Sequence, residues 1–399
     1  MALVRTLHNA TNSGSVAGPA TSFNPCTQGS IRNANFLGEA EAESRCWRPR
    51  TYSNMYVNVA TNTHTASTTI VFRKNGADGN QTITIPAGVT GYFEDSVNTD
   101  SVVVGDNVCF KIDRGTGGAS RFSNIGVYAQ NEGAMIVQTS SVGSLSFVSA
   151  ATIQHAFGQL FSTTNNTALW LPRTRFRARN QEVYVSANTR NGTCTVGSCT
   201  ILAGVTGKFT NSAAFFDYTA SSPSAGFNVV IGGTTGGITI NKYTVELAFP
   251  TSEVQYANTS AGTSLGTGLS GTRTMSISGV PAELAPNASA VKLLENCTVK
   301  RLTYNTAAHG QLTTSGITFA YFKNGSSSGM SVSEAANTFG NVTIEDSTNT
   351  FTMNTTDTID ARYTRSGGSN SSLCRFWGLV VDYNNYIPPD PKTGNGMIC

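Results

Sequence analysis

Charged residues are scarce in this chain of 399 residues: Asp, Glu, Lys and Arg make up 12% of it, about half the usual share of roughly 25%. Lys and Arg number 26 against 23 Asp and Glu, so the formal net charge is only +3. A nucleic-acid surface needs clustered cations to displace counterions, and no Lys/Arg run occurs here. We therefore expect no nucleic-acid partner.

Long apolar runs are also missing. None approaches the roughly 20 residues that span a bilayer as a helix, and residues 1–9 lack the apolar stretch of a secretory signal peptide. We therefore expect no membrane partner. Hydrophobic residues still make up 39% of the chain, so it can build packed cores and is not disordered. This composition argues against a typical cytosolic enzyme.

The eight cysteines are scattered, and only Cys194 and Cys199 lie close together. Gly197 between them predicts a tight turn, which would let the two thiols face each other across a hairpin and form a disulfide. Two separate thiols are the simpler and favoured reading. Because the four histidines are isolated and no second Cys/His pair has metal-ligand spacing, the sequence predicts no metal and no cofactor.

Internal repetition is the most informative feature of the chain. Trp47–Thr51 reads Trp-Arg-Pro-Arg-Thr, and Trp170–Thr174 repeats it as Trp-Leu-Pro-Arg-Thr, 123 positions later. Ala87–Phe93 returns as Ala203–Phe209 with one difference, 116 positions later. Two diverged copies of one unit explain both echoes.

Other pieces of the same unit return a third time. Phe72–Gly76 recurs as Phe322–Gly325 without its Arg, and Glu94–Ser96 recurs as Glu345–Ser347, in each case about 250 positions later. A period of 120–125 residues is too long for a solenoid repeat and has the length of a domain. The sequence therefore predicts three diverged copies of one domain.

Apolar residues within the copies alternate with polar ones. This period of two is clear in residues 82–85, 107–112 and 317–321, and turn clusters such as 74–80 and 115–118 lie between such runs. Alternating Val, Ile, Thr and aromatic residues are typical of half-buried strands. We predict an all-β chain of three tandem antiparallel β-sandwich domains, with a jelly-roll or an immunoglobulin-like topology.

The echoes place the domain boundaries. The sequence predicts an extended N-terminal arm at 1–30, sandwich repeats at 31–139, 140–256 and 257–386, and a C-terminal tail at 387–399.

Residues that might carry chemistry also have structural readings. Glu94 and Asp95 could form a carboxylate pair, but the second copy has Thr210 and Asn211 there, so a strand-end turn former explains them better. The run Gly232–Gly237 precedes an apparent strand instead of a helix, which favours a flexible hairpin loop over a phosphate cradle. No Gly-x-Ser-x-Gly or His-Glu-x-x-His motif occurs. We predict no catalytic residue and no enzyme.

The two Trp-x-Pro-Arg-Thr segments supply the candidate contact residues. Trp47 and Trp170 could stack on carbohydrate, but their recurrence favours packing at a domain shoulder. The arginines beside these prolines could form ion pairs between domains or subunits, and a solvated surface is the alternative; they are Arg48, Arg50, Arg173 and Arg175. A glycan contact therefore stays open.

One part of the chain resembles a known group. The residues Phe72–Gly76, Pro86–Gly91, Phe93–Asp95 and Gly105–Asp106 resemble β-sandwich modules of tailed-bacteriophage virion proteins, of capsid-decoration or fibre type. The likeness is good over residues 56–112, weaker elsewhere in the repeats, and rests on turn and strand motifs. It implies a structural part of the virion and supplies no catalytic residues.

The sequence thus favours a non-enzymatic virion structural protein that assembles with copies of itself and with other virion proteins at the virion surface. Low charge and many Thr, Ser and Asn residues suit close-packed, hydrogen-bonded interfaces. Two alternatives remain open: a cell-surface adhesin or carbohydrate-binding protein, and the subunit of an extracellular homopolymer filament. A polysaccharide depolymerase is least favoured.

Overall fold

A computed structural model describes residues 4–12, 16–31, 38–131, 134–157, 170–222, 224–265, 271–275, 277, 290–306, 316–335, 342–365 and 372–384. The predicted tail at 387–399 lies outside the described residues. Within them nearly every element is a strand, and the one helix is the short α1 (Glu39–Ala42). The all-β prediction is confirmed.

The first unit contains eight main strands in two sheets. In chain order they are β1 (Val4–Asn12), β3 (Thr21–Pro25), β6 (Arg50–Asn62), β7 (Thr68–Lys74), β8 (Ala77–Ile85), β9 (Gly91–Val102), β10 (Asn107–Asp113) and β11 (Ala119–Asn131). One sheet has the order β1-β11-β6-β9 and the other the order β3-β10-β7-β8. Counted within the unit, these orders are 1-8-3-6 and 2-7-4-5, which is the double Greek key of a jelly roll.

The second and third units repeat this order. The second contains β12 (Ala134–Phe147), β13 (Ala151–Ala156), β14 (Phe176–Asn188), β15 (Cys194–Val196), β16 (Cys199–Ile201), β17 (Gly207–Tyr218), β18 (Gly226–Ile231) and β19 (Ile238–Ala248). The third contains β20 (Glu253–Leu265), β21 (Gly271–Met275), β23 (Cys297–Thr306), β24 (Ile317–Lys323), β25 (Ser326–Glu334), β26 (Thr343–Asp346), β27 (Phe351–Met353), β28 (Thr358–Arg365) and β29 (Ser372–Tyr383). Its sixth strand is split into β26 and β27, which both pair with β23. All three units are therefore jelly rolls, not immunoglobulin-like sandwiches.

The strand order differs from the predicted boundaries at both ends of the first unit. Instead of an arm, residues 1–30 supply β1, which pairs with β11, and β3, which pairs with β10. The second unit begins at Ala134 and not at residue 140, because β12 pairs with β19. The sequence echoes lie between the start of the third strand and the sixth strand of the units, so they did not locate the first two strands.

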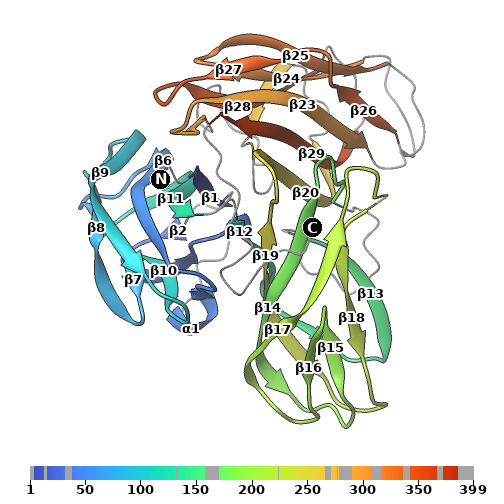
Figure 1. Ribbon diagram of the computed structural model, residues 1–399. Coiled ribbons are helices and arrows are strands. Elements are labelled where there is room, and N and C mark those ends of the chain that lie inside the picture. Colours follow the sequence, from blue (N-terminus) through green and yellow to red (C-terminus); the bar gives the residue numbers. More distant parts are fainter. Residues whose placement is uncertain are drawn as a thin grey trace.

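Four short strands complete the sheets: β2 (Val16–Ala17), β4 (Gln28–Ile31), β5 (Ser44–Arg45) and β22 (Val291–Lys292). β4 lies parallel to both β1 and β12 and joins the first two units in one sheet of ten strands. Figure 1 shows the first unit (blue) and the second (green to yellow) side by side, with the third (orange to red) lying across one end of both.

The hydrophobic clusters group the units differently from the sheets: one sheet joins the first and second units, whereas one cluster joins the second and third. The first unit has its own cluster, with Tyr52, Phe72 and Phe110 at its centre. The cores of the second and third units form one continuous cluster, which includes Trp170 and Trp377 and reaches Leu7, Tyr56 and Tyr128 of the first unit. No helix in the described part of the chain is long and apolar enough to cross a membrane.

Candidate functional site

The Asp of the repeated Glu-Asp motif closes a turn in the first and third units. Asp95 accepts hydrogen bonds from the backbone N–H of Val97 (3.2 Å) and Asn98 (3.0 Å) within β9, and from Thr82 N–H (2.8 Å) in the opposite sheet. Burial alone would raise the pKa of Asp95, but these hydrogen bonds lower it below its usual value. Asp95 therefore ties two sheets together and is not poised for acid–base chemistry.

The equivalent residues of the other units do the same work. Asp346 accepts from the backbone N–H of Asn349 (3.0 Å) and Ser331 (3.1 Å). Asn211 accepts from Ala214 N–H (3.0 Å), and its side-chain amide donates to Ser198 O (2.8 Å). The prediction of turn chemistry is confirmed, because an uncharged Asn serves as well as Asp.

The Lys-Asn-Gly segments of the first and third units form tight hairpins. Asn75 and Gly76 have φ values of +52° and +77°, and the corresponding Asn324 and Gly325 have +50° and +78°. Two successive residues with positive φ are typical of a type I′ turn. Asn75 also donates to Asp106 (2.7 Å), as Asn324 does to Asp357. The motif that carries the resemblance to virion modules is therefore a structural brace.

Cys194 and Cys199 do not form the disulfide that their spacing allowed. Both thiols are free and buried. In the hairpin, Cys194 lies opposite Ile201 and Cys199 lies opposite Val196. The two-residue turn at Gly197–Ser198 sets this register and leaves the two cysteines diagonal to each other.

The glycine-rich run Gly232–Gly237 connects β18 to β19, which belong to opposite sheets, so it is not a hairpin loop. The buried side chain of Arg190 donates to the carbonyl groups of Gly232 (2.8 Å), Gly233 (2.6 Å) and Gly236 (2.8 Å). These carbonyl groups surround a cation, so the loop is unsuited to hold a phosphate.

Helix α1 of the first unit contacts the second unit through carboxylates. Glu43 pairs with Lys208 (2.8 Å), and Glu41 accepts from Asn241 (3.2 Å). Burial raises the pKa of Glu41.

The outer face of β19 is covered as well, and every residue of this strand is buried. Its Lys242 forms a fully buried ion pair with Glu182 (3.2 Å). Its Glu246 pairs with Arg48 of the first unit (2.6 Å) and accepts from Asn180 (2.6 Å). Burial lowers the pKa of Lys242. Charged side chains thus lie inside the interface between the first and second units.

The candidate contact residues of the first unit have distinct places. Arg50 is 4% exposed and begins β6. Trp47 is half-buried, with the Arg45 guanidinium 5.2 Å from its ring centre. Their neighbour Arg48 makes the ion pair to the second unit. The sequence did not show which of Arg48 and Arg50 faces the second unit, because the start of β6 and its place in the sheet were not known.

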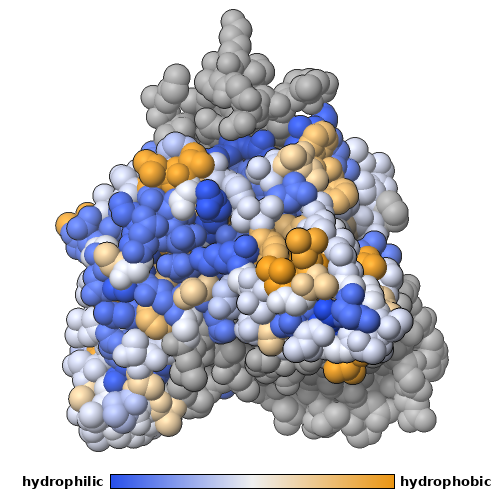
Figure 2. Space-filling model, turned by 90° about the horizontal axis from the view of Figure 1, so that it is seen from below, coloured by the Kyte–Doolittle hydropathy of each residue, from blue (hydrophilic) through white to orange (hydrophobic). Residues whose placement is uncertain are grey.

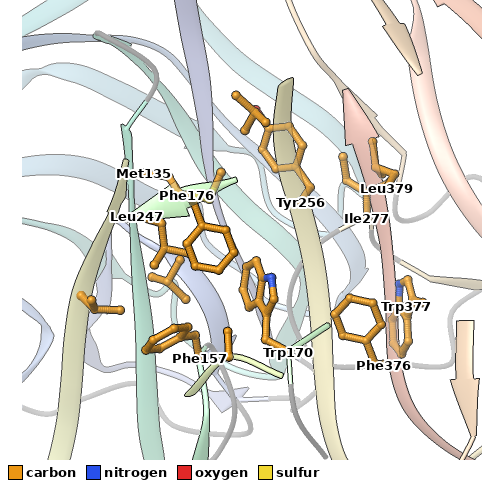
Figure 3. Packing of buried hydrophobic residues seen from close by; sticks show 14 of the residues in the cluster. Met135, Phe157, Trp170, Phe176, Leu247, Tyr256, Ile277, Phe376, Trp377 and Leu379 are labelled. Carbon is orange, nitrogen blue, oxygen red and sulfur yellow. The ribbon is translucent and has the colours of Figure 1, made fainter. Parts of the chain in front are cut away.

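Trp170 and Arg173 face the third unit. Trp170 is 1% exposed and packs edge-on against Phe157 and Phe176 in the shared cluster. Figure 3 shows it between these rings and the strands that carry Tyr256 and Trp377. Arg173 pairs with Glu345 of the third unit, and its backbone N–H donates to Gln255 (2.8 Å).

The first and third units also touch. Lys292 pairs with Glu94 (3.0 Å) and lies 5.0 Å from the ring centre of Tyr92. The Tyr256 hydroxyl accepts from Leu7 N–H (3.3 Å) and bonds to the Tyr383 hydroxyl (2.6 Å). Each unit therefore contacts the other two. Among the described residues, no group of three or more His, Cys, Asp or Glu side chains could hold a metal ion.

Comparisons with known proteins give a limited result. No family model and no curated protein matches the chain. Among solved structures, a chain of the Sulfolobus turreted icosahedral virus is 14% identical, with coverage of 84% of this chain and 79% of that one and a TM-score of 0.17.

Two further solved structures are similar at the same low level. A chain described as a triple jelly-roll fold with turret assembly in an archaeal virus is 13% identical, with coverage of 95% of both chains and a TM-score of 0.16. A chain of the T=1 particles of infectious bursal virus is 11% identical, with coverage of 91% and 74% and a TM-score of 0.17. These three neighbours are viral, and none of the three comes from a tailed bacteriophage; the jelly-roll assignment rests on the strand order above.

Proposed function

We propose that this chain is a non-enzymatic structural protein of a virus particle, which assembles with copies of itself and other virion proteins at the virion surface. The observation that carries this proposal is the jelly-roll strand order, present three times in one chain. Jelly rolls are compact double-sheet blocks that occur in viral capsids and lectins. The resemblance of residues 56–112 supports the finer proposal of a decoration or fibre protein of a tailed bacteriophage.

Apolar side chains at one edge of the ten-stranded sheet support assembly. Val97 on the edge strand β9 is 85% exposed, and Val103 and Val104 in the turn after it are 62% and 57% exposed. Exposed apolar patches of this kind are separated by hydrophilic surface on the face seen in Figure 2. An edge strand with apolar side chains gains from burial against another chain. We assign this edge to contact with a second copy.

Sedimentation of the purified full chain tests this assignment. We expect concentration-dependent oligomers, and we expect the substitution Val97→Asp to weaken association at least tenfold because it would bury an unpaired charge. Val97→Thr is the matched control, since it keeps the shape and the strand preference. A wild-type chain that stays monomeric at all concentrations, or equal association of the two variants, would refute the assignment.

Peptide mass spectrometry across a density gradient of nuclease-treated particles separates the virion proposal from its alternatives. Stoichiometric banding with protected genomes supports it. Banding with cell envelopes favours the adhesin or carbohydrate-binding alternative, and helical fibres in micrographs favour the filament.

A further inference from the structure

Exposed apolar side chains are distributed unevenly among the three units. In the described part of the chain, every exposed apolar side chain of Val or larger belongs to the first or the second unit. The described surface of the third unit has none. Clustered exposed apolar groups mark surfaces that another molecule covers. The first and second units are therefore the ones whose surface calls for a partner.

One exposed loop recurs in these same two units. Residues 87–91 read Ala-Gly-Val-Thr-Gly, and residues 203–207 read the same. Each loop leads into a strand at one end of the ten-stranded sheet, the first into β9 and the second into β17. In the third unit, residues 335–340 between β25 and β26 read Ala-Ala-Asn-Thr-Phe-Gly. The repeated loop is thus a feature of the two units that expose apolar side chains.

The two loops have the same backbone conformation. Gly88 and Gly91 have φ values of +69° and +114°, and Gly204 and Gly207 have +71° and +108°. Residues other than glycine rarely adopt such values. The conformation therefore explains why the glycines recur, but it does not explain the Ala, Val and Thr between them.

The same side-chain contact holds each loop in place. The amide of Asn62 donates to two carbonyl groups of the first loop, Pro86 O and Val89 O, at 3.0 Å each. The amide of Asn188 donates to the two corresponding carbonyl groups of the second loop, at 2.9 and 3.0 Å. Loops braced in this way lose little conformational entropy when they bind.

The retained side chains point to a contact outside each unit. The Ala, Val and Thr side chains are exposed in both loops, and Val89 and Val205 are 42% and 41% exposed. The strand before the loop has changed far more, since β8 has nine residues and β16 has three. Exposed loop residues that stay the same while the neighbouring strand changes indicate binding and not packing within the unit.

The occupant has to offer the same kind of surface at two places. Both loops are uncharged and identical over five residues, so one kind of partner fits both. The first loop is continuous with the β9 edge, where Val97 is exposed and which we assign above to a second copy. The second loop is continuous with β17, which carries the exposed Phe215 and Phe216. Copies of this chain supply a repeated, identical partner surface.

We propose that two further copies of this chain dock at these places, one on the Ala-Gly-Val-Thr-Gly loop and edge strand of the first unit and one on those of the second. The third unit takes no part in this contact. This inference rests on the assembly function proposed above and names the surfaces that carry it.

Sedimentation of the full chain over a range of concentrations tests the proposal. We expect Val89→Asp and Val205→Asp each to weaken association at least tenfold, because each would bury an unpaired charge in the contact. The two side chains lie in different units, so their effects should multiply to about a hundredfold in the double variant. Thermal unfolding of each monomer should match that of the wild type, since both side chains are exposed.

Val148→Asp is the matched control. Val148 is 72% exposed in the second unit and lies outside both loops and both edge strands. Its association should equal that of the wild type. An equal loss of association in the control and in the loop variants would overturn the proposal, because it would show a general effect of added charge.

Hydrogen exchange of the wild-type chain is a second measurement and does not depend on how the variants fold. Amides of residues 86–91 and 202–207 should exchange more slowly in the associated chain than in the monomer. If the chain associates but these amides are not slowed, the inference is wrong, and a loss of association in Val97→Asp would still support the assembly function. A chain that stays monomeric at every concentration would refute both.

Discussion

The second unit meets its two neighbours through opposite kinds of surface. Toward the third unit it shares one apolar cluster, in which Trp170 is 1% exposed. Toward the first it presents charged side chains, and Lys242 and Glu182 are buried there with 0% and 1% of their side chains exposed. Apolar contact stabilises in proportion to buried area, whereas each buried charge needs its own partner.

This difference has a consequence for cooperativity. A shared apolar core cannot be divided without exposing it, so the second and third units should unfold together. The first unit keeps its own core around Phe72 and Phe110, adds three residues to the edge of the shared cluster, and contacts the second unit through hydrogen bonds and ion pairs. We therefore expect two unfolding transitions.

The largest expected effect comes from Trp170→Ala. Loss of this ring leaves a cavity in the shared core and should cost about 3–5 kcal/mol, which lowers the transition of the second and third units in calorimetry. Phe72→Ala is the matched change in the core of the first unit, where Phe72 is fully buried, and should lower only the other transition. One common transition, shifted equally by both variants, would contradict the division.

Breaking the buried ion pair at the polar interface should cause a smaller loss of stability, which a second substitution should restore. Lys242→Met leaves Glu182 buried without its partner and should cost about 3 kcal/mol. The double variant with Glu182→Leu removes both charges and should regain or exceed the wild-type free energy of unfolding in denaturant titrations. A double variant no more stable than the single one would contradict the assignment of that loss to the unpaired charge of Glu182.

The smallest effect is expected for the ion pair on the apolar side. Arg173 and Glu345 have side chains 17% and 30% exposed, so Arg173→Met should cost less than about 1 kcal/mol. The cost is measured as the shift of the same calorimetric transition that Trp170→Ala lowers. A loss as large as that of Trp170→Ala would mean that charge, not apolar burial, holds these two units together.

The sequence correctly predicted the turns that are set by residues close together in the chain. The Asn75–Gly76 hairpin and the turn at Asp95 depend on residues within a few positions, and their recurrence near Asn324 and Asp346 revealed the repeat. For Cys194 and Cys199 the sequence left a disulfide and two separate thiols open, and the structure has two free thiols. In a two-residue hairpin turn, Cys199 must face Val196, so a closer count across Gly197 would have ruled out the pairing.

The exact places of the two repeated tryptophans were beyond the sequence. Their recurrence favoured packing at a domain shoulder over carbohydrate stacking. Trp170 is 1% exposed in the core shared by the second and third units, whereas Trp47 is half-buried beside Arg45.

The sequence by itself determined that the chain is all β and built from three related units, because alternation and turn chemistry act over short distances. Only the tertiary structure decided that β1 pairs with β11 to complete the first jelly roll and that Lys242 lies buried at an interface. Both depend on segments far apart in the chain, and their contacts form only when the whole fold brings those segments together.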